Sequence, residues 1–131
     1  MSPKKLQTRP GDVGQARSRR VIAQKYLEVA ELIATEDGMS VNVCIALTVL
    51  AGMAAGDAIC LSATGERYSG PDHAAAADLL ARVDSNAGKN LQRLVSFKAA
   101  SHYGARLLDE DDRRAALRAA ADLVREAARR T

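Results

Sequence analysis

The feature that most constrains the fold is an apolar run from Val41 to Ala63 near the middle of the chain. As a helix this run is about 35 Å long, enough to cross a lipid bilayer. However, Asp57 lies within it, Asn42 lies near its start, and Ala, Gly and Ser are commoner in it than Leu or Phe. No aromatic belt flanks it either. We therefore expect the buried central helix of a soluble bundle and no membrane span.

Periodicity and end signals predict helices on both sides of this run. We expect helices over residues 15–34, 40–64, 71–83 and 89–103, and from about residue 109 to the C-terminus. Ser85–Gly88 are expected to form a break between the third and fourth helices. The short connections between these segments indicate antiparallel neighbours.

Apolar spacing predicts the buried faces of the first and last helices. The first helix carries four large apolar residues at helical spacing: Ile22, Tyr26, Val29 and Ile33. The last helix carries a similar set: Leu117, Ala121, Val124 and Ala128. Its start is acidic, which suits the positive end of a helix dipole, and Asp109 and Arg113 form an expected i, i+4 pair there.

Composition supports one helical domain. The chain has 131 residues, is rich in alanine and contains no Trp and a single Phe. Alanine favours helices, whereas sheets favour aromatic and β-branched residues. We therefore predict an all-α antiparallel up-down bundle of four to five helices over residues 15–131, preceded by a flexible basic arm over residues 1–14.

The positive charge belongs to the N-terminal part of the chain. Residues 1–25 carry seven Lys or Arg and one Asp, a net +6, whereas the other 106 residues carry 12 basic and 15 acidic groups, a net −3. Such an arm can bind phosphates through counterion release. It can equally be a solvated tail, and the sequence leaves both alternatives open.

The two cysteines predict a reducing compartment. Cys44 and Cys60 fall in one expected helix, about 24 Å apart, so they cannot form a disulfide. Together with the absence of a signal peptide, this predicts a cytoplasmic protein. The sequence has no zinc pattern and no Gly-rich phosphate loop, so we expect no metal and no cofactor.

Lys98, His102 and Asp57 are candidates for catalysis. Lys98 and His102 share a helix face, where His102 could act as general acid or base while Lys98 neutralises a phosphate. The alternative is that Lys98 extends to water and His102 makes a structural hydrogen bond. Asp57, within the apolar run, must be paired or protonated, and its expected partners are Lys98, His102 or Arg67. It either forms an ion pair that holds the second helix to the fourth or orients a histidine.

His73 is a candidate for phosphate binding. It lies in the first turn of the expected third helix, where backbone amides favour anions. Arg67 precedes it by six residues, and the two side chains could hold one phosphate. The alternative is a capping turn with a solvated histidine.

Two segments resemble domains of the HEPN superfamily. The first is the run Val41–Gly65, followed by the loop residues Arg67 to Pro71 and by Asp72 and His73. In that superfamily a long helix of small residues precedes a Gly-containing loop and a His that opens the next helix. The second segment, residues 94–103 (LVSFKAASHY), with Gly104 and an acidic last-helix start, is similar to the closing half of such domains. The resemblance covers roughly residues 20–128.

This resemblance implies binding of RNA or a nucleotide. It implies Tyr103, Arg67 and His73 as phosphate-binding residues, and Lys98, His102 and Asp57 as catalytic residues of a metal-independent RNase of toxin–antitoxin or defence type. Family RNases use an Arg, a short spacer and a His. Arg67 and His73 have this spacing but cross a loop. On the fourth helix Lys98 stands in place of Arg, with only three residues between it and His102.

The expected partners also follow from this resemblance. It implies a homodimer, because the family's catalytic motif usually lies near a dimer interface, and a nucleotidyltransferase or an antitoxin as a further partner. The second hypothesis is a non-catalytic helical module that binds a partner protein. Whether the chain is an enzyme stays open at this point.

Overall fold

A computed structural model describes residues 5–103 and 107–131, without the side chains of residues 99–103. In these residues it contains five α-helices and one small two-stranded sheet, which confirms the predicted helical bundle. The helices are α1 (Val13–Leu32), α2 (Met39–Thr64), α3 (His73–Val83), α4 (Ser85–Tyr103) and α5 (Glu110–Arg130). The strands are β1 (Thr8–Pro10) and β2 (Glu66–Tyr68).

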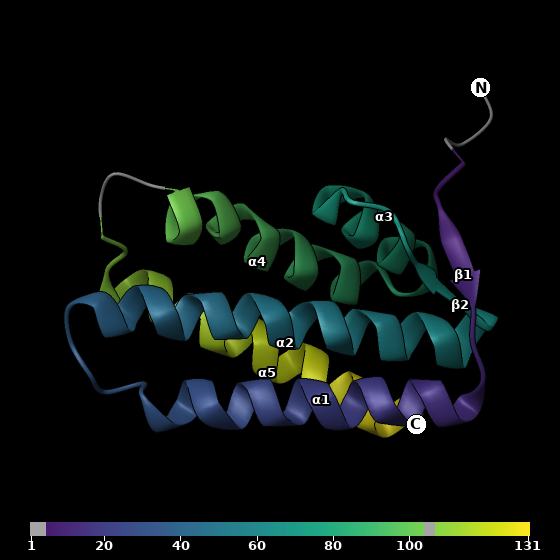
Figure 1. Cartoon of the computed structure of the whole chain (residues 1–131), viewed down its shortest axis with the longest axis horizontal. Coiled ribbons are helices and arrows are strands. Elements are labelled where there is room, and N and C mark those ends of the chain that lie inside the picture. Colours follow the sequence, from purple (N-terminus) through teal and green to yellow (C-terminus); the bar gives the residue numbers. More distant parts are fainter. Residues whose placement is uncertain (1–4, 104–106) are drawn as a thin grey trace.

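The helix α2 is the centre of the bundle. Figure 1 shows α1 and α4 on either side of α2 and antiparallel to it, with α5 passing behind. By length and composition α2 could cross a membrane, but 67% of its most apolar stretch is buried inside the protein. This burial is what the core helix of a bundle requires.

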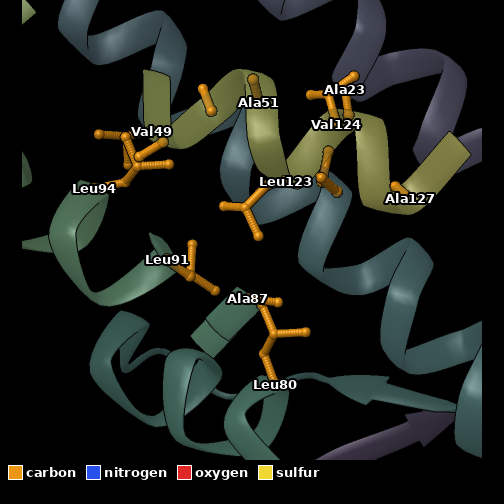
Figure 2. Packing of buried hydrophobic residues seen from close by; sticks show 14 of the residues in the cluster. Ala23, Val49, Ala51, Leu80, Ala87, Leu91, Leu94, Leu123, Val124 and Ala127 are labelled. Atoms are coloured by element: carbon orange, nitrogen blue, oxygen red, sulfur yellow. The ribbon is translucent and has the colours of Figure 1, made fainter. Parts of the chain in front are cut away.

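Small residues in α2 allow the neighbouring helices to come close. A Cβ on Gly52 would clash with Leu94 and would lie 3.4 Å from side-chain atoms of Leu91 and Leu123. These leucines of α4 and α5 converge in the centre of the core (Figure 2). Close packing therefore explains a glycine that costs helix propensity.

The buried face of α1 consists of alanines, so the predicted stripe is right only in part: Tyr26 packs against the core but is not fully buried. Ala16, Ala23 and Ala30 are fully buried, whereas Ile22 and Val29 are 39% and 38% exposed. The physical reason is the short distance between α1 and α2, which leaves room for a methyl group but not for a larger side chain. One sign of this proximity is the Cys44 thiol, which donates to the carbonyl of Ala30 at 3.3 Å.

Residues 8–14 are structured, which corrects the flexible arm predicted over residues 1–14. The strand β1 pairs antiparallel with β2, and Arg9 lies opposite Arg67. Proline has no N–H and fits the edge position that Pro10 occupies. Asp12 then caps α1 by accepting a hydrogen bond from the Gln15 amide at 2.8 Å.

The helix α4 begins earlier than the sequence predicted. Ser85–Gly88 form its first turn, and the Asp84 carboxylate accepts a hydrogen bond from the Ala87 amide at 3.0 Å. Gly88 is required for packing, since a Cβ there would lie 2.6 Å from the Cα of Ala81 in α3. The glycine that looked like a helix breaker therefore permits the contact between α3 and α4.

Candidate phosphate-binding site

Packing of α3 against α4 brings His73 and Lys98 together. The Lys98 Nζ lies 3.0 Å from His73 Nδ1. An ammonium group has no acceptor, so the lysine donates, His73 Nδ1 accepts, and the neutral ring carries its proton on Nε2. His73 is the first residue of α3, directly after the capping residue Asp72.

The surroundings of His73 keep its ring neutral. Burial lowers the pKa of His73, the nearby charge of Lys98 lowers it further, and Asp72 partly opposes both effects. Because the lowered pKa lies below the usual 6.5, the imidazole is neutral at pH 7. The pair therefore offers an Nε2–H group and an ammonium group, both of which are donors suited to phosphate oxygens.

His102 and Tyr103 occupy the last turn of α4, but their side chains lie outside the described residues. Position 102 is four residues after Lys98 in the same helix, so the two positions share a face. The roles predicted for His102 and Tyr103 remain predictions.

Asp57 belongs to a second cluster. Its Oδ2 lies 3.1 Å from a terminal nitrogen of Arg19 in α1. A hollow of about 280 Å³ is lined there by Gln15, Ser18, Arg19, Asp57, Leu61 and Arg67. Burial raises the pKa of Asp57, while the charges of Arg19 and Arg67 lower it. Of the three expected partners, Arg67 is thus a neighbour, while the direct ion pair is with Arg19.

The predicted shared cleft of Asp57 and Lys98 is not what the structure shows. Gly52 lies against Leu94 and Gly56 against Leu91, so Asp57 reaches about the level of Asn90 along the antiparallel α4. Lys98 is eight residues further along, roughly 12 Å away along the helix axis. Asp57 therefore joins α2 to α1, whereas the structural alternative that the sequence offered was a pair between the second and fourth helices.

Arg67 and His73 also belong to different clusters, which corrects their predicted joint phosphate site. Pairing of β2 with β1 holds Arg67 beside Asp57, and Arg67 donates to the Tyr68 carbonyl at 3.3 Å. The chain then folds back, so that His73 contacts α4 instead.

Sequence reasoning missed Arg19. The available signal was its position three residues before Ile22, on the face of α1 that borders α2. That face was predicted to be buried in the core, where a charged arginine side chain is not expected.

The composition of the clusters limits the ligands they can hold. Among the described residues, no three His, Cys, Asp or Glu side chains gather closely enough to hold a metal ion. Comparison with protein-family models gave no match, and comparison with curated protein sequences gave none either. The fold and the site therefore define only the class of protein: a bundle of five helices in the described residues, with a short two-stranded antiparallel sheet and a His–Lys pair between α3 and α4.

Proposed function

We propose that this protein binds RNA or a nucleotide through phosphate, at the site formed by His73 and Lys98. The observation that carries the proposal is the 3.0 Å contact between Lys98 Nζ and His73 Nδ1. Two residues that the sequence singled out separately, one for phosphate binding and one for catalysis, lie in one place. The resemblance to HEPN domains supports the same class of ligand.

The geometry of the pair suits a phosphate oxygen. The lysine hydrogen bond to Nδ1 fixes the His73 ring and places its proton on Nε2, which can donate to an oxygen. The backbone amides of the first turn of α3 add partial positive charge, although the Ala74 amide is already bonded to Asp72 at 3.0 Å. A ligand phosphate would therefore receive donors from two helices.

Cleavage of RNA is a finer hypothesis that rests on the same residues. Attack of a ribose 2′-hydroxyl on the adjacent phosphorus requires a base for that hydroxyl and a proton donor for the leaving 5′ oxygen. His102 is the candidate base, and the Lys98 ammonium group is the candidate proton donor. The neutral His73 ring can donate a hydrogen bond to a phosphate oxygen but is a poor acid. The products would be a 2′,3′-cyclic phosphate and a 5′-hydroxyl, without any metal ion.

Binding is tested by fluorescence anisotropy with a labelled single-stranded RNA. We expect His73→Ala and Lys98→Ala each to weaken binding about tenfold, and Lys98→Ala also to lower the salt dependence by about one ion. The matched control is Lys89→Ala, an exposed lysine in the first turns of the same helix. If the wild-type protein shows no affinity, or if Lys89→Ala weakens binding as much, the proposal is wrong.

Cleavage is tested separately with the same RNA in EDTA. Loss of cleavage in His102→Ala, with binding retained, would support the RNase hypothesis. Binding without cleavage by the wild-type protein would support a nucleic-acid-binding domain and would contradict the RNase hypothesis.

A non-catalytic interaction module is the second candidate function. The observation that favours it is the exposure of large apolar side chains on α1 and α2, among them Val43 at 50% and Leu50 at 45%. Such a module would bind a protein, for instance a nucleotidyltransferase. It predicts that His73→Ala leaves the activity of the partner complex unchanged.

A further inference from the structure

Large apolar side chains form a strip on the surface where α1 and α2 lie side by side. In the core these helices meet through alanines and glycines, whereas the strip carries leucine, valine and isoleucine. We call this strip the α1/α2 face; it consists of the exposed residues Ile22, Val29, Val43 and Leu50 and the half-buried residues Tyr26 and Met53. Exposed apolar surface of this kind marks interaction sites in soluble proteins.

Two contacts fix how α1 and α2 lie side by side. Near one end the Cys44 thiol donates to the carbonyl of Ala30, and near the other end Arg19 pairs with Asp57 at 3.1 Å. This antiparallel register places the exposed apolar residues of α1 directly beside those of α2. Spacings of three, four and seven residues keep them on one side of each helix.

One end of the molecule beyond the α1/α2 face is acidic. Glu36 and Asp37 are exposed in the connection between α1 and α2. Arg113 donates to the Glu36 carbonyl at 2.5 Å, which brings the acidic start of α5, residues 109–112, to the same end. The negative charge is therefore shared by two segments that are far apart in the sequence.

The other end of the face is basic. Arg9 and Arg67 are cross-strand partners, so their side chains point to the same side of the two-stranded sheet. Arg67 lies with Arg19 around the single carboxylate of Asp57. The charges of α1 and its following connection show the same division: Arg17, Arg19, Arg20 and Lys25, then Glu28, Glu31, Glu36 and Asp37.

We propose that two copies of this chain form a dimer through their α1/α2 faces, packed antiparallel. A two-fold axis lying in the interface, at right angles to the helices, puts the basic end of each copy over the acidic end of the other. A parallel arrangement would bring like charges together, which costs free energy. This charge pattern identifies the occupant as a second copy of the chain, and the inference does not rest on the proposed function.

The size of the face suits such a dimer. The helix α1 is about 30 Å long, and two helices side by side are about 20 Å wide. The face and its charged ends thus present roughly 600 Å² in projection. A standard interface takes about 800 Å² of accessible surface from each partner.

The dimer is tested by sedimentation equilibrium of the full chain over a range of concentrations. We expect a dimer mass for the wild type and a dissociation constant raised at least about tenfold by Leu50→Lys, because two lysines would meet near the axis. The matched control is Leu32→Lys, a change at a residue that is 73% exposed and lies on the side of α1 facing α5. Circular dichroism checks that both variants keep the helical fold.

A charge exchange tests the antiparallel arrangement itself. Variant one carries Glu36→Lys and Asp37→Lys, and variant two carries Arg9→Glu and Arg67→Glu. We expect each to dimerise weakly alone and a mixture of the two to form heterodimers, because opposite charges then meet at both ends of the complex.

Three results would overturn the inference. One is a wild-type monomer at every concentration, which would leave the face to a different protein. Another is a dimer that Leu50→Lys does not weaken, since the contact would then lie on another surface. The third is a mixture of the charge-reversed variants that associates no better than either variant alone.

Discussion

At the scale of single residues, the most informative side chain is Arg113. It is the largest fully buried side chain among the described residues, with an exposed fraction of 1%. It donates to the carbonyls of Ile33 at 3.3 Å and Glu36 at 2.5 Å, and it pairs with Glu110 rather than with Asp109 as predicted. These carbonyls lie past the end of α1, where no helical amide can satisfy them. Arg113 therefore supplies the donors that close this end of the bundle.

Replacement of Arg113 should be costly for this reason. We expect Arg113→Met to lower the free energy of unfolding by about 3 kcal/mol, because two part-buried carbonyls and the Glu110 carboxylate would lose a charged donor. Urea unfolding at pH 7 measures this. The matched control is Arg114→Met, whose pair with Asp111 is exposed to solvent and should contribute less than about 1 kcal/mol. Equal effects of the two substitutions would contradict the structural role of Arg113.

At the scale of elements, the ends of helices decide how neighbouring segments are joined. Arg130 near the end of α5 lies 2.8 Å from Glu126 and 3.3 Å from Asp84, the residue between α3 and α4. Glu126 also pairs with Arg129. This network connects the last helix to the corner on which α3 and α4 turn.

The network should give a pH-dependent contribution to stability. Hydrogen bonds from Arg129 and Arg130 lower the pKa of Glu126 to about 2. A carboxylate with a lowered pKa stabilises the fold above its ordinary pKa of 4.5, and this stabilisation is lost as the pH falls toward 2. We expect Glu126→Gln to cost about 1 kcal/mol at pH 7, since solvent screens the pair.

Urea unfolding across pH 2 to 7 would check this dependence. The difference between wild type and Glu126→Gln should shrink below about pH 4.5 and vanish near pH 2. Asp122→Asn, which removes an exposed pair with Arg125, is the control and should show little difference at any pH. A cost that stays constant over the whole range would count against the ionised network.

Glycine sets the distance between elements at the contact of α3 and α4. A Cβ at Gly88 would lie 2.6 Å from Cα and 2.9 Å from the backbone N of Ala81, and backbone atoms cannot move aside as a side chain can. We expect Gly88→Ala to destabilise the protein by at least about 2 kcal/mol, although alanine is the better helix former.

Gly56→Ala is the matched control in thermal unfolding. Its new Cβ would meet only leucine side-chain atoms, at 3.3 and 3.4 Å. The change should stay within about 1 kcal/mol of wild type. If Gly88→Ala proved as stable as Gly56→Ala, the two helices could not be as close as the structure has them.

At the scale of the whole molecule, composition was enough to predict the helical fold but not the arrangement of its faces. The apolar run, the capping residues and the short connections are local signals, and they placed the helices within a few residues. Of the face predicted for α5, Val124 is buried, but Leu117 and Ala121 are only partly buried. The other buried residues of this helix include Ala116, Ala120 and Leu123. In this protein the helices pack so closely that alanines form much of the core, and residue size no longer indicates the buried side.

The candidate site was predictable only as separate residues. The sequence pointed to His73 and Lys98 individually, but their contact depends on how α3 folds back over α4. Asp57 was recognised as a charge needing a partner, yet Arg19, 38 positions earlier, could not be chosen before the register of α1 and α2 was known.

The α1/α2 face, whose apolar residues were partly predicted to be core, also gives the molecule a property that no single helix has. Its long axis runs from a basic end to an acidic end, with apolar surface between them. If two copies associate through that surface, unfolding must also separate them, so the thermal midpoint should depend on protein concentration. A tenfold increase should raise the midpoint by about 2–3 °C for a dimer of this size.

Salt should separate the two contributions to this association. Screening at 0.5 M salt is expected to weaken attraction between the charged ends and to lower the midpoint at low protein concentration, while burial of the apolar strip persists. Calorimetry of the wild type and of Leu50→Lys would measure both effects, with Leu32→Lys as the control. The Leu50→Lys midpoint should no longer depend on concentration, because the strip is central to the contact. A wild-type midpoint that is independent of concentration would instead mean that the protein unfolds as a monomer. The basic and acidic ends would then make no contact between copies.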